Sequence, residues 1–236
     1  MPNDNGRGVM TRTRSGPWAD LALTLPIFIA YHLGVVFLQV RNAADLVTRE
    51  LVTLAHNSTI GYFGLTLGIG AVFVATLVVL GRSHSLRWDR FALVAAEGVL
   101  YALAMRLMAS YVVGRLFLGP LVHDRSTGLI MSLGAGFYEE IGFRVVLFGF
   151  GAQLLSLLFS ARAPLKALLI RAGWAALAAA AFSGWHYVGA LGESFDLKSF
   201  TFRWVCGMAF TAIYAFRGFA PAVWTHALYD IWVLVL

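Results

Sequence analysis

The chain has 236 residues, of which 59% are hydrophobic and 13% charged, and its mean hydropathy is +0.75. A soluble domain carries about 25% charged residues, so this composition excludes a soluble globular domain and predicts that most of the chain lies in lipid. The formal charge of +6 comes from basic residues between apolar runs, a pattern typical of membrane proteins and not of nucleic-acid-binding proteins.

The first part of the chain predicts a tail and one membrane span. Residues 1–17 form a polar, basic N-terminal tail, and an apolar run follows over about 18–40. That run exceeds the 7–15-residue core of a signal peptide, so we expect a retained span with a kink at Pro26. In the polar segment 41–59 we expect a short interfacial helix.

The rest of the chain predicts further spans at about 60–80, 91–118, 172–190, 200–216 and 219–236, each near the roughly 20 residues that cross a bilayer. The apolar run 128–160 is too long for one upright span. Gly134 and Gly136 in it predict a break before a long helix over 138–159. The expected fold is one all-α domain over 18–236, a polytopic membrane bundle of about seven helices.

The basic residues predict the orientation of the bundle. They concentrate in the N-terminal tail, in the 81–90 and 161–171 loops and at Arg217, whereas the 119–127 and 191–199 loops carry few. The positive-inside rule then predicts a cytoplasmic N-terminus. The basic tail and the shortness of the chain favour a bacterial inner membrane. The single cysteine, Cys206, excludes an intrachain disulfide.

Ionisable residues occur inside the apolar runs at helical spacing, where a charge costs about 2.5–3.5 kcal/mol on insertion scales. The first group is Glu139-Glu140-x-x-x-Arg144. Glu140 and Arg144 share a helix face and can pair, whereas Glu139 points about 100° away in an α-helix and has no partner in its own helix. A carboxylate in such surroundings can act as a general base; the alternative is a structural salt bridge beside a glutamate that faces a polar cavity.

Two histidine groups follow in later apolar runs. Phe182 and His186 share one helix face, and Gly184 between them would let a backbone or a substrate approach closely. His226 and Asp230 share another face, so the carboxylate could orient the imidazole or bind a substrate. Alone, each histidine also fits a structural role, as a hydrogen-bonded core residue or as one half of a polar pair.

Together, in this order, the three groups resemble the CPBP family of CAAX proteases and bacteriocin-processing enzymes, also called the Abi family. That family's pattern is EExxxR, FxxxH and HxxxN or HxxxD, and here it covers about residues 128–230, within a core that extends to 236. The resemblance implies a glutamate-dependent intramembrane endopeptidase. Glu139 would activate water with help from His186, and His226 and Asp230 would stabilise the oxyanion. Glu140, Arg144 and Phe182 would support the site.

Several alternatives stay open. Glu139, His186 and His226 could instead ligate zinc, although the resemblance implies a mechanism without metal or other cofactor. The substrate could be a CAAX-like lipidated or peptide precursor, or an exported protein with a C-terminal apolar sorting tail. The chain could also be a non-catalytic immunity or scaffold protein of the same family. A proton-coupled transporter is less favoured because no long repeat is present.

The remaining polar residues of the spans have simpler interpretations. We expect His32 to be a hydrogen-bonded core histidine. Glu97, Arg106 and Arg115 are expected to pair or to reach the membrane surface, with docking of a substrate's C-terminus as the alternative role.

Overall fold

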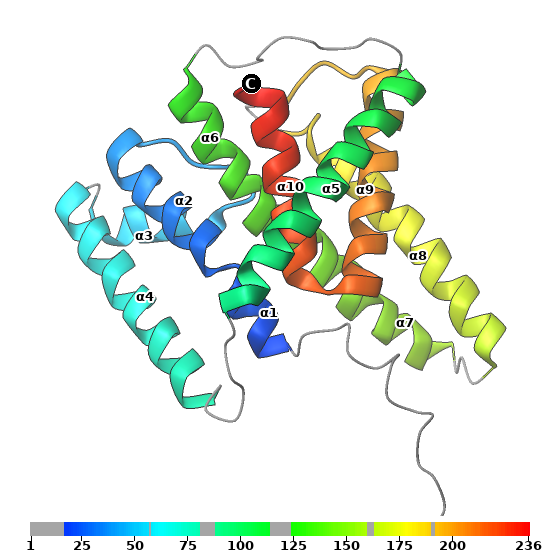
Figure 1. Ribbon diagram of the computed structural model, residues 1–236, viewed down its shortest axis with the longest axis horizontal. Coiled ribbons are helices and arrows are strands. Elements are labelled where there is room, and N and C mark those ends of the chain that lie inside the picture. The colour runs from blue at the N-terminus through cyan, green and yellow to red at the C-terminus, as the bar shows by residue number, and fades with distance from the viewer. Residues whose placement is uncertain (1–16, 57, 81–87, 114–123, 160–162, 190–191) are drawn as a thin grey trace, which may run out of the picture.

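The computed structural model describes residues 17–56, 58–80, 88–113, 124–159, 163–189 and 192–236, and within these ranges every regular element is a helix (Figure 1). This confirms the all-α fold. The first elements are α1 (Pro17–Leu23), α2 (Leu25–Leu38), α3 (Leu46–Leu54), α4 (Thr59–Leu80) and α5 (Trp88–Val113). The later elements are α6 (Arg125–Gly134), η1 (Ala135–Phe150), α7 (Gly151–Leu158), α8 (Pro164–Trp185), α9 (Leu197–Arg217) and α10 (Phe219–Leu234).

The first expected span is broken into α1 and α2 at Thr24. Pro26 occupies the first turn of α2, where a helix needs no backbone N–H donor. Its ring would clash with the preceding turn of a continuous helix, so α1 ends before it. The Thr24 hydroxyl donates to the Leu21 carbonyl at 2.7 Å and so satisfies the end of α1. The polar segment after α2 contains α3, the short helix that was expected there, and Asp45 caps it by accepting from the Thr48 amide.

The break expected at Gly134 and Gly136 is absent, and this prediction was wrong. Helices α6, η1 and α7 form one continuous 34-residue helix over Arg125–Leu158, of which η1 has π-helical i→i+5 geometry. The helix begins at Asp124, whose side chain accepts from the Ser126 and Thr127 amides. These bonds, with those from the two hydroxyls, hold the pKa of the exposed Asp124 carboxyl at about 2.

The two glycines serve close packing instead of a break. A Cβ on Gly136 would lie 2.7 Å from Ala227 Cβ and 2.9 Å from the Val223 carbonyl oxygen of α10. A Cβ on Gly134 would collide with the Tyr31 ring and would lie 2.8 Å from Asn42 Cβ. Small residues at both positions therefore let this helix approach α10 and the segment after α2.

The last three helices differ from the expected spans mainly at their ends. Helix α8 begins at Pro164, so Lys166 and Arg171 lie on the helix and not in a loop. Proline suits a first helical turn, and the lysine and arginine that follow are good helix formers, which explains the earlier start. Between α9 and α10 the chain turns at Gly218, whose φ of 106° is readily adopted only by glycine.

Three of the described helices are long and apolar enough to cross a membrane: Asp89–Ala109, Arg125–Leu158 and Pro164–Trp185. Leu25–Leu38 and Thr59–Val72 are shorter apolar stretches. A helical membrane bundle is thus confirmed, but seven spans are not. Some of the predicted features lie outside the described residues, namely most of the N-terminal tail and the segments 81–87, 114–123, 160–162 and 190–191. These segments include Arg115 and parts of the loops from which the membrane orientation was predicted.

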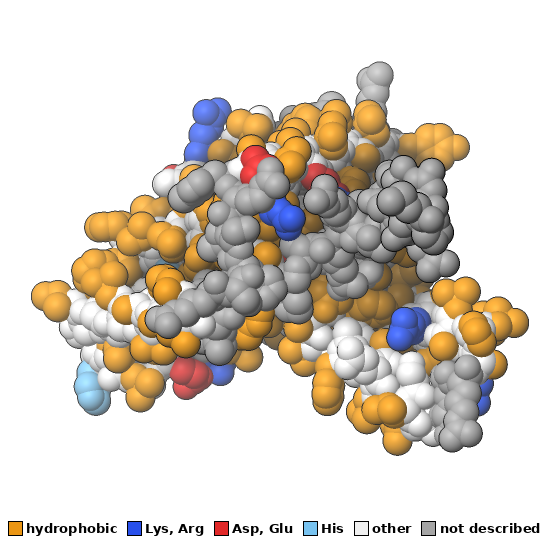
Figure 2. All heavy atoms as spheres, turned by 60° about the horizontal axis from the view of Figure 1, so that its bottom comes forward, with side chains coloured by type: hydrophobic (Ala, Val, Ile, Leu, Met, Phe, Trp, Pro, Cys, Tyr) orange, Lys and Arg blue, Asp and Glu red, His pale blue; other side chains and the backbone are white. Residues whose placement is uncertain are grey.

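Helix α10 lies at the centre of the bundle and packs against α5, α6, η1 and α9 (Figure 1). One core cluster joins α2, α3, α4, α6, η1 and α10, and another joins α5, α8, α9 and α10. Apolar side chains also cover much of the outer surface in Figure 2, as expected for helices that face lipid. The buried polar residues Glu140 and Arg144 of η1 and His226 of α10 meet between these two clusters.

His32, Glu97 and Arg106 have polar or aromatic partners, as expected. The His32 ring lies 2.8 Å from the Tyr138 hydroxyl and 3.3 Å from the Tyr62 hydroxyl. Glu97 accepts from Arg217 at 3.0 Å. Arg106 stacks on Trp232, with its guanidinium carbon 4.8 Å from the ring centroid.

Candidate active site

Helix η1 buries both glutamates of the first motif. Glu139, Glu140 and Arg144 are 5%, 0% and 1% exposed. Both glutamates therefore face the interior of the bundle, and the described contacts of Glu139 come from outside its own helix.

Glu140 and Arg144 form the expected pair, with Arg144 Nη1 3.1 Å from Glu140 Oε1. None of the three guanidinium nitrogens has hydrogen-bond geometry to any described partner, so the contact is an ion pair without an aligned hydrogen bond. Aromatic rings hold the guanidinium instead: its carbon lies 4.2 Å from the Phe182 centroid and 5.1 Å from the Phe210 centroid. Such cation–π contacts are strongest where water is excluded.

His226 connects this pair to the other carboxylates. Its Nδ1 lies 2.7 Å from Glu140 Oε1, and its Nε2 lies 3.5 Å from Asp230 Oδ2 and 4.0 Å from Glu139 Oε2. Phe210 of α9 stacks on the imidazole, with ring centroids 4.3 Å apart and planes at 21°. The ring is thus fixed in position and plane, with Nδ1 anchored by one glutamate and Nε2 directed toward the other.

The two oxygens of Glu139 have different surroundings. Oε1 accepts from the Asn42 side-chain amide at 3.0 Å, and Oε2 is buried without a hydrogen-bond partner in the described structure. Asn42 comes from the turn between α2 and α3, far from Glu139 in sequence. It is a site residue that the sequence analysis missed, and only the unusual position of a buried asparagine at the end of an apolar run could have indicated it.

His186 lies apart from this group. It is only partly buried, at the end of α8, and its Nδ1 lies 3.0 Å from the Phe182 carbonyl of its own helix. Among the described residues no hydrogen bond or ion pair joins it to Glu139 or His226. The Phe182 ring separates the two histidines, with its centroid 5.3 Å from His186 and 5.8 Å from His226. Gly184 has no atom within 4 Å of an added Cβ, so no backbone packs closely there.

The described residues contain no group of three or more His, Cys, Asp or Glu side chains arranged to hold a metal ion. Glu139, His186 and His226, the alternative zinc ligands, are therefore not assembled as a set in this structure. A small pocket of about 110 Å³ opens between α2, α3 and α4, and its lining includes Thr48 and Tyr62 but none of the motif residues.

The arrangement defines a class of site. A carboxylate with one bonded and one unpartnered oxygen faces an anchored imidazole, and both are buried among apolar helices. These are the groups that acid–base hydrolysis of an amide requires: a base for water and a hydrogen-bond donor where negative charge develops.

The comparison with protein families agrees with this class. Residues 121–232 match the family described as Rce1-like, type II CAAX prenyl endopeptidase, and the match contains all three motifs. This region therefore resembles the CAAX protease family, as its motifs predicted. No curated protein and no solved structure matches the chain.

Proposed function

We propose that the protein is an intramembrane endopeptidase that hydrolyses a peptide bond of a membrane-anchored protein, with Glu139 as the general base. The observation that carries the proposal is the 4.0 Å separation of Glu139 Oε2 and His226 Nε2, whose side chains are 7% and 4% exposed. One water can bridge a gap of this length. The match of residues 121–232 to a protease family supports the same reaction.

In the proposed reaction, Glu139 Oε2 takes a proton from water and the hydroxide forms a bond to the scissile carbonyl carbon. The carbonyl oxygen then carries the negative charge of a tetrahedral intermediate. When the C–N bond breaks, the proton on Glu139 passes to the leaving amine, which restores the carboxylate. The step is balanced by one water and needs no redox partner.

The other residues have supporting roles in this proposal. His226, when it carries a proton on Nε2, donates to the oxyanion, and Asp230 stabilises the charged ring. Glu140 and Arg144 hold the imidazole in place. Donation from His186 Nδ1–H to the Phe182 carbonyl leaves the Nε2 lone pair as an acceptor, which suits help in water activation once substrate has entered.

The depth of the site favours a substrate that enters the bilayer. His226 lies in the middle of the 16-residue α10, about 11–12 Å from either end at 1.5 Å per residue. We therefore propose a protein with a C-terminal apolar sorting tail or a CAAX-like lipidated tail as substrate. Both carry an apolar group that can move laterally to the helices.

The test is cleavage by the full chain in proteoliposomes. Two fluorogenic substrates are used, a farnesylated CAAX peptide and a peptide with a C-terminal apolar helix. Wild type should cleave at least one, and Glu139→Gln should lower kcat by at least about 100-fold. Glu193→Gln, an exposed glutamate paired with Arg203, is the matched control and should cleave at the wild-type rate. Folded wild type that cleaves neither peptide, or full activity in Glu139→Gln, would contradict the proposal and favour an immunity or scaffold role.

A further inference from the structure

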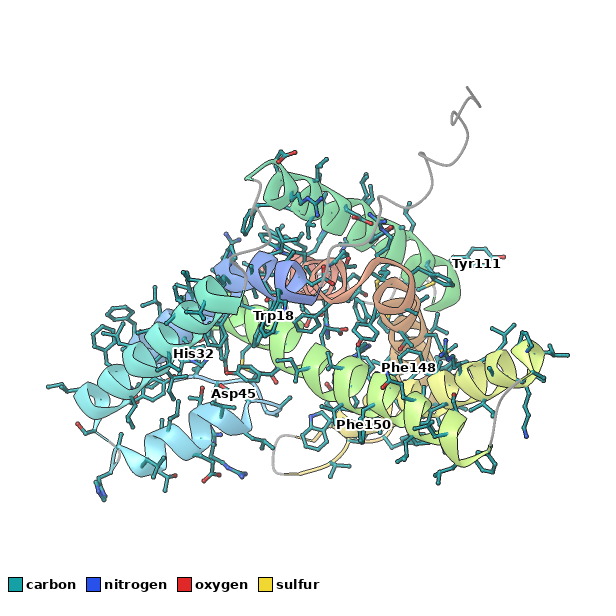
Figure 3. All side chains as sticks on the ribbon, turned by 90° about the horizontal axis from the view of Figure 1, so that it is seen from below. Trp18, His32, Asp45, Tyr111, Phe148 and Phe150 are labelled. Atoms are coloured by element: carbon teal, nitrogen blue, oxygen red, sulfur yellow. The ribbon has the colours of Figure 1, made fainter. Side chains whose placement is uncertain are left out.

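Glu139 is bonded by a residue from outside the family match. The Asn42 side-chain amide donates to Glu139 Oε1 at 3.0 Å, and both residues are 5% exposed. Asn42 lies in the turn between α2, which carries His32, and α3, which is capped by Asp45, and Figure 3 labels His32 and Asp45. The matched region begins at residue 121, so the N-terminal helices supply this contact.

Asn42 is itself held in one orientation. Its Oδ1 accepts from the Ala44 amide at 2.8 Å, and its own backbone N–H donates to the Tyr31 hydroxyl at 3.0 Å. Tyr31 in turn donates to Asp45 at 2.7 Å. Because Oδ1 is bonded to a backbone N–H, the side-chain NH₂ must face Glu139, and the reverse orientation would place an oxygen against a carboxylate.

The turn that carries Asn42 packs closely against the long helix that carries Glu139. A Cβ on Gly134, five residues before Glu139, would lie 2.8 Å from Asn42 Cβ. Buried polar groups are costly unless they are bonded, so the connected set of Tyr31, Asn42 and Asp45 is stable only as a unit. Among the described residues, the hydrogen bond from Asn42 to Glu139 joins this set to the active-site motifs.

We propose that Asn42 is a positioning residue for Glu139. By holding Oε1, it directs Oε2 toward His226 and makes Oε2 the oxygen that receives the proton. The inference rests on the proposed function, because it assigns the basic oxygen of that reaction. Asn42 does not reach the reacting atoms itself.

The proposal predicts a change in the hydrogen bonding of the Glu139 carboxyl group. The Asn42 amide bonds one of its two oxygens, so loss of this donor should change the frequency of the carboxyl stretching band. The charged and titratable groups around Glu139 are its neighbour Glu140, Arg144 of the same helix, and His226 and Asp230 of α10. Substitution of Asn42 leaves all of these groups in place.

The experiment is infrared difference spectroscopy of the full chain in detergent, in which the Glu139 carboxyl band is identified by its loss in Glu139→Gln. In Asn42→Ala this band should shift in frequency, because one carboxyl oxygen has lost its amide donor. Tyr31→Phe, which keeps Asn42 but removes the hydroxyl that anchors it, should shift the band in the same direction by less. Tyr62→Phe is the control, because it removes a buried hydroxyl of α4 that lies 3.3 Å from the His32 ring and leaves Asn42 and its described hydrogen bonds in place.

Kinetics provide the second readout. Asn42→Ala should lower kcat by about tenfold with little change in KM, since Asn42 does not contact substrate. An unchanged band in Asn42→Ala, or an equal shift in Tyr62→Phe, would overturn the inference. The spectrum needs no cleavage, so failure of the proposed function leaves it measurable. Active enzyme with an unchanged band in Asn42→Ala would refute the role of Asn42 alone.

Discussion

Substitution of Arg144 by alanine should destabilise the bundle strongly. The change removes the ion pair with Glu140 and both ring contacts of the guanidinium, with Phe182 of α8 and Phe210 of α9. It leaves a fully buried Glu140 whose remaining partner among the described residues is His226, with Oε1 2.7 Å from Nδ1. The effect therefore combines loss of contacts between helices with an uncompensated buried charge.

The magnitude follows from the type of each contact. Breaking a buried ion pair by removing one partner costs about 3–5 kcal/mol. Glu140 and Arg144 lie on one helix, however, so part of the pair survives when helices separate in a membrane. The two cation–π contacts join different helices and contribute about 0.5–2 kcal/mol each. We expect the free energy of unfolding to fall by about 2–4 kcal/mol.

The assay is reversible unfolding in mixed detergent micelles with increasing sodium dodecyl sulfate, followed by circular dichroism. Arg144→Met, Glu140→Gln and the double variant complete a cycle, in which the double variant should be more stable than the sum of the single losses predicts by about 0.5–3 kcal/mol. A loss below about 1 kcal/mol in Arg144→Ala, or additive losses in the cycle, would refute the reasoning from buried charge.

Three further predictions concern the packing of η1 on α10, the need for a metal ion and the orientation in the membrane. Gly136→Ala should lower the free energy of unfolding by about 1–3 kcal/mol, because its Cβ would overlap Ala227 and Val223. Gly142→Ala, whose Cβ would have no atom within 4 Å, should change this free energy little, and equal losses would contradict the close approach of η1 and α10. Purified enzyme should contain no stoichiometric zinc and keep its activity in strong chelator, and loss of activity that zinc alone restores would favour a metalloprotease. In a Cys206→Ala background, Ser194→Cys should react with an impermeant maleimide from outside and Lys166→Cys only after the cytoplasmic face is opened, and the reverse pattern would invert the topology.

Spacing along the chain predicts the contacts made within single helices. Glu140 with Arg144 and His226 with Asp230 are each four residues apart, and the structure places both pairs in contact. This works because i and i+4 share a helix face whatever the tertiary structure is. Polar residues in an apolar run also indicate the interior of a bundle, since lipid cannot solvate them.

Contacts between helices were not predictable in the same way. The bond from Asn42 to Glu139 and the stacking of Phe210 on His226 depend on how helices far apart in sequence pack. The π-helical geometry of η1 likewise has no periodic signal in the sequence. Gly136 was taken as a break because glycine is a poor helix former, whereas packing against α10 decides its role.

The most direct test of the central claim is whether Glu139 and His226 act on one water as a unit. The kcat of Glu139→Gln, of His226→Gln and of the double variant should be measured on the same cleaved peptide. Each single variant should lose about 10²–10⁴-fold, and the double variant should be no slower than the worse single one, because residues that act together are not additive. Losses that multiply in the double variant, or a single variant with the wild-type kcat, would contradict the shared catalytic centre.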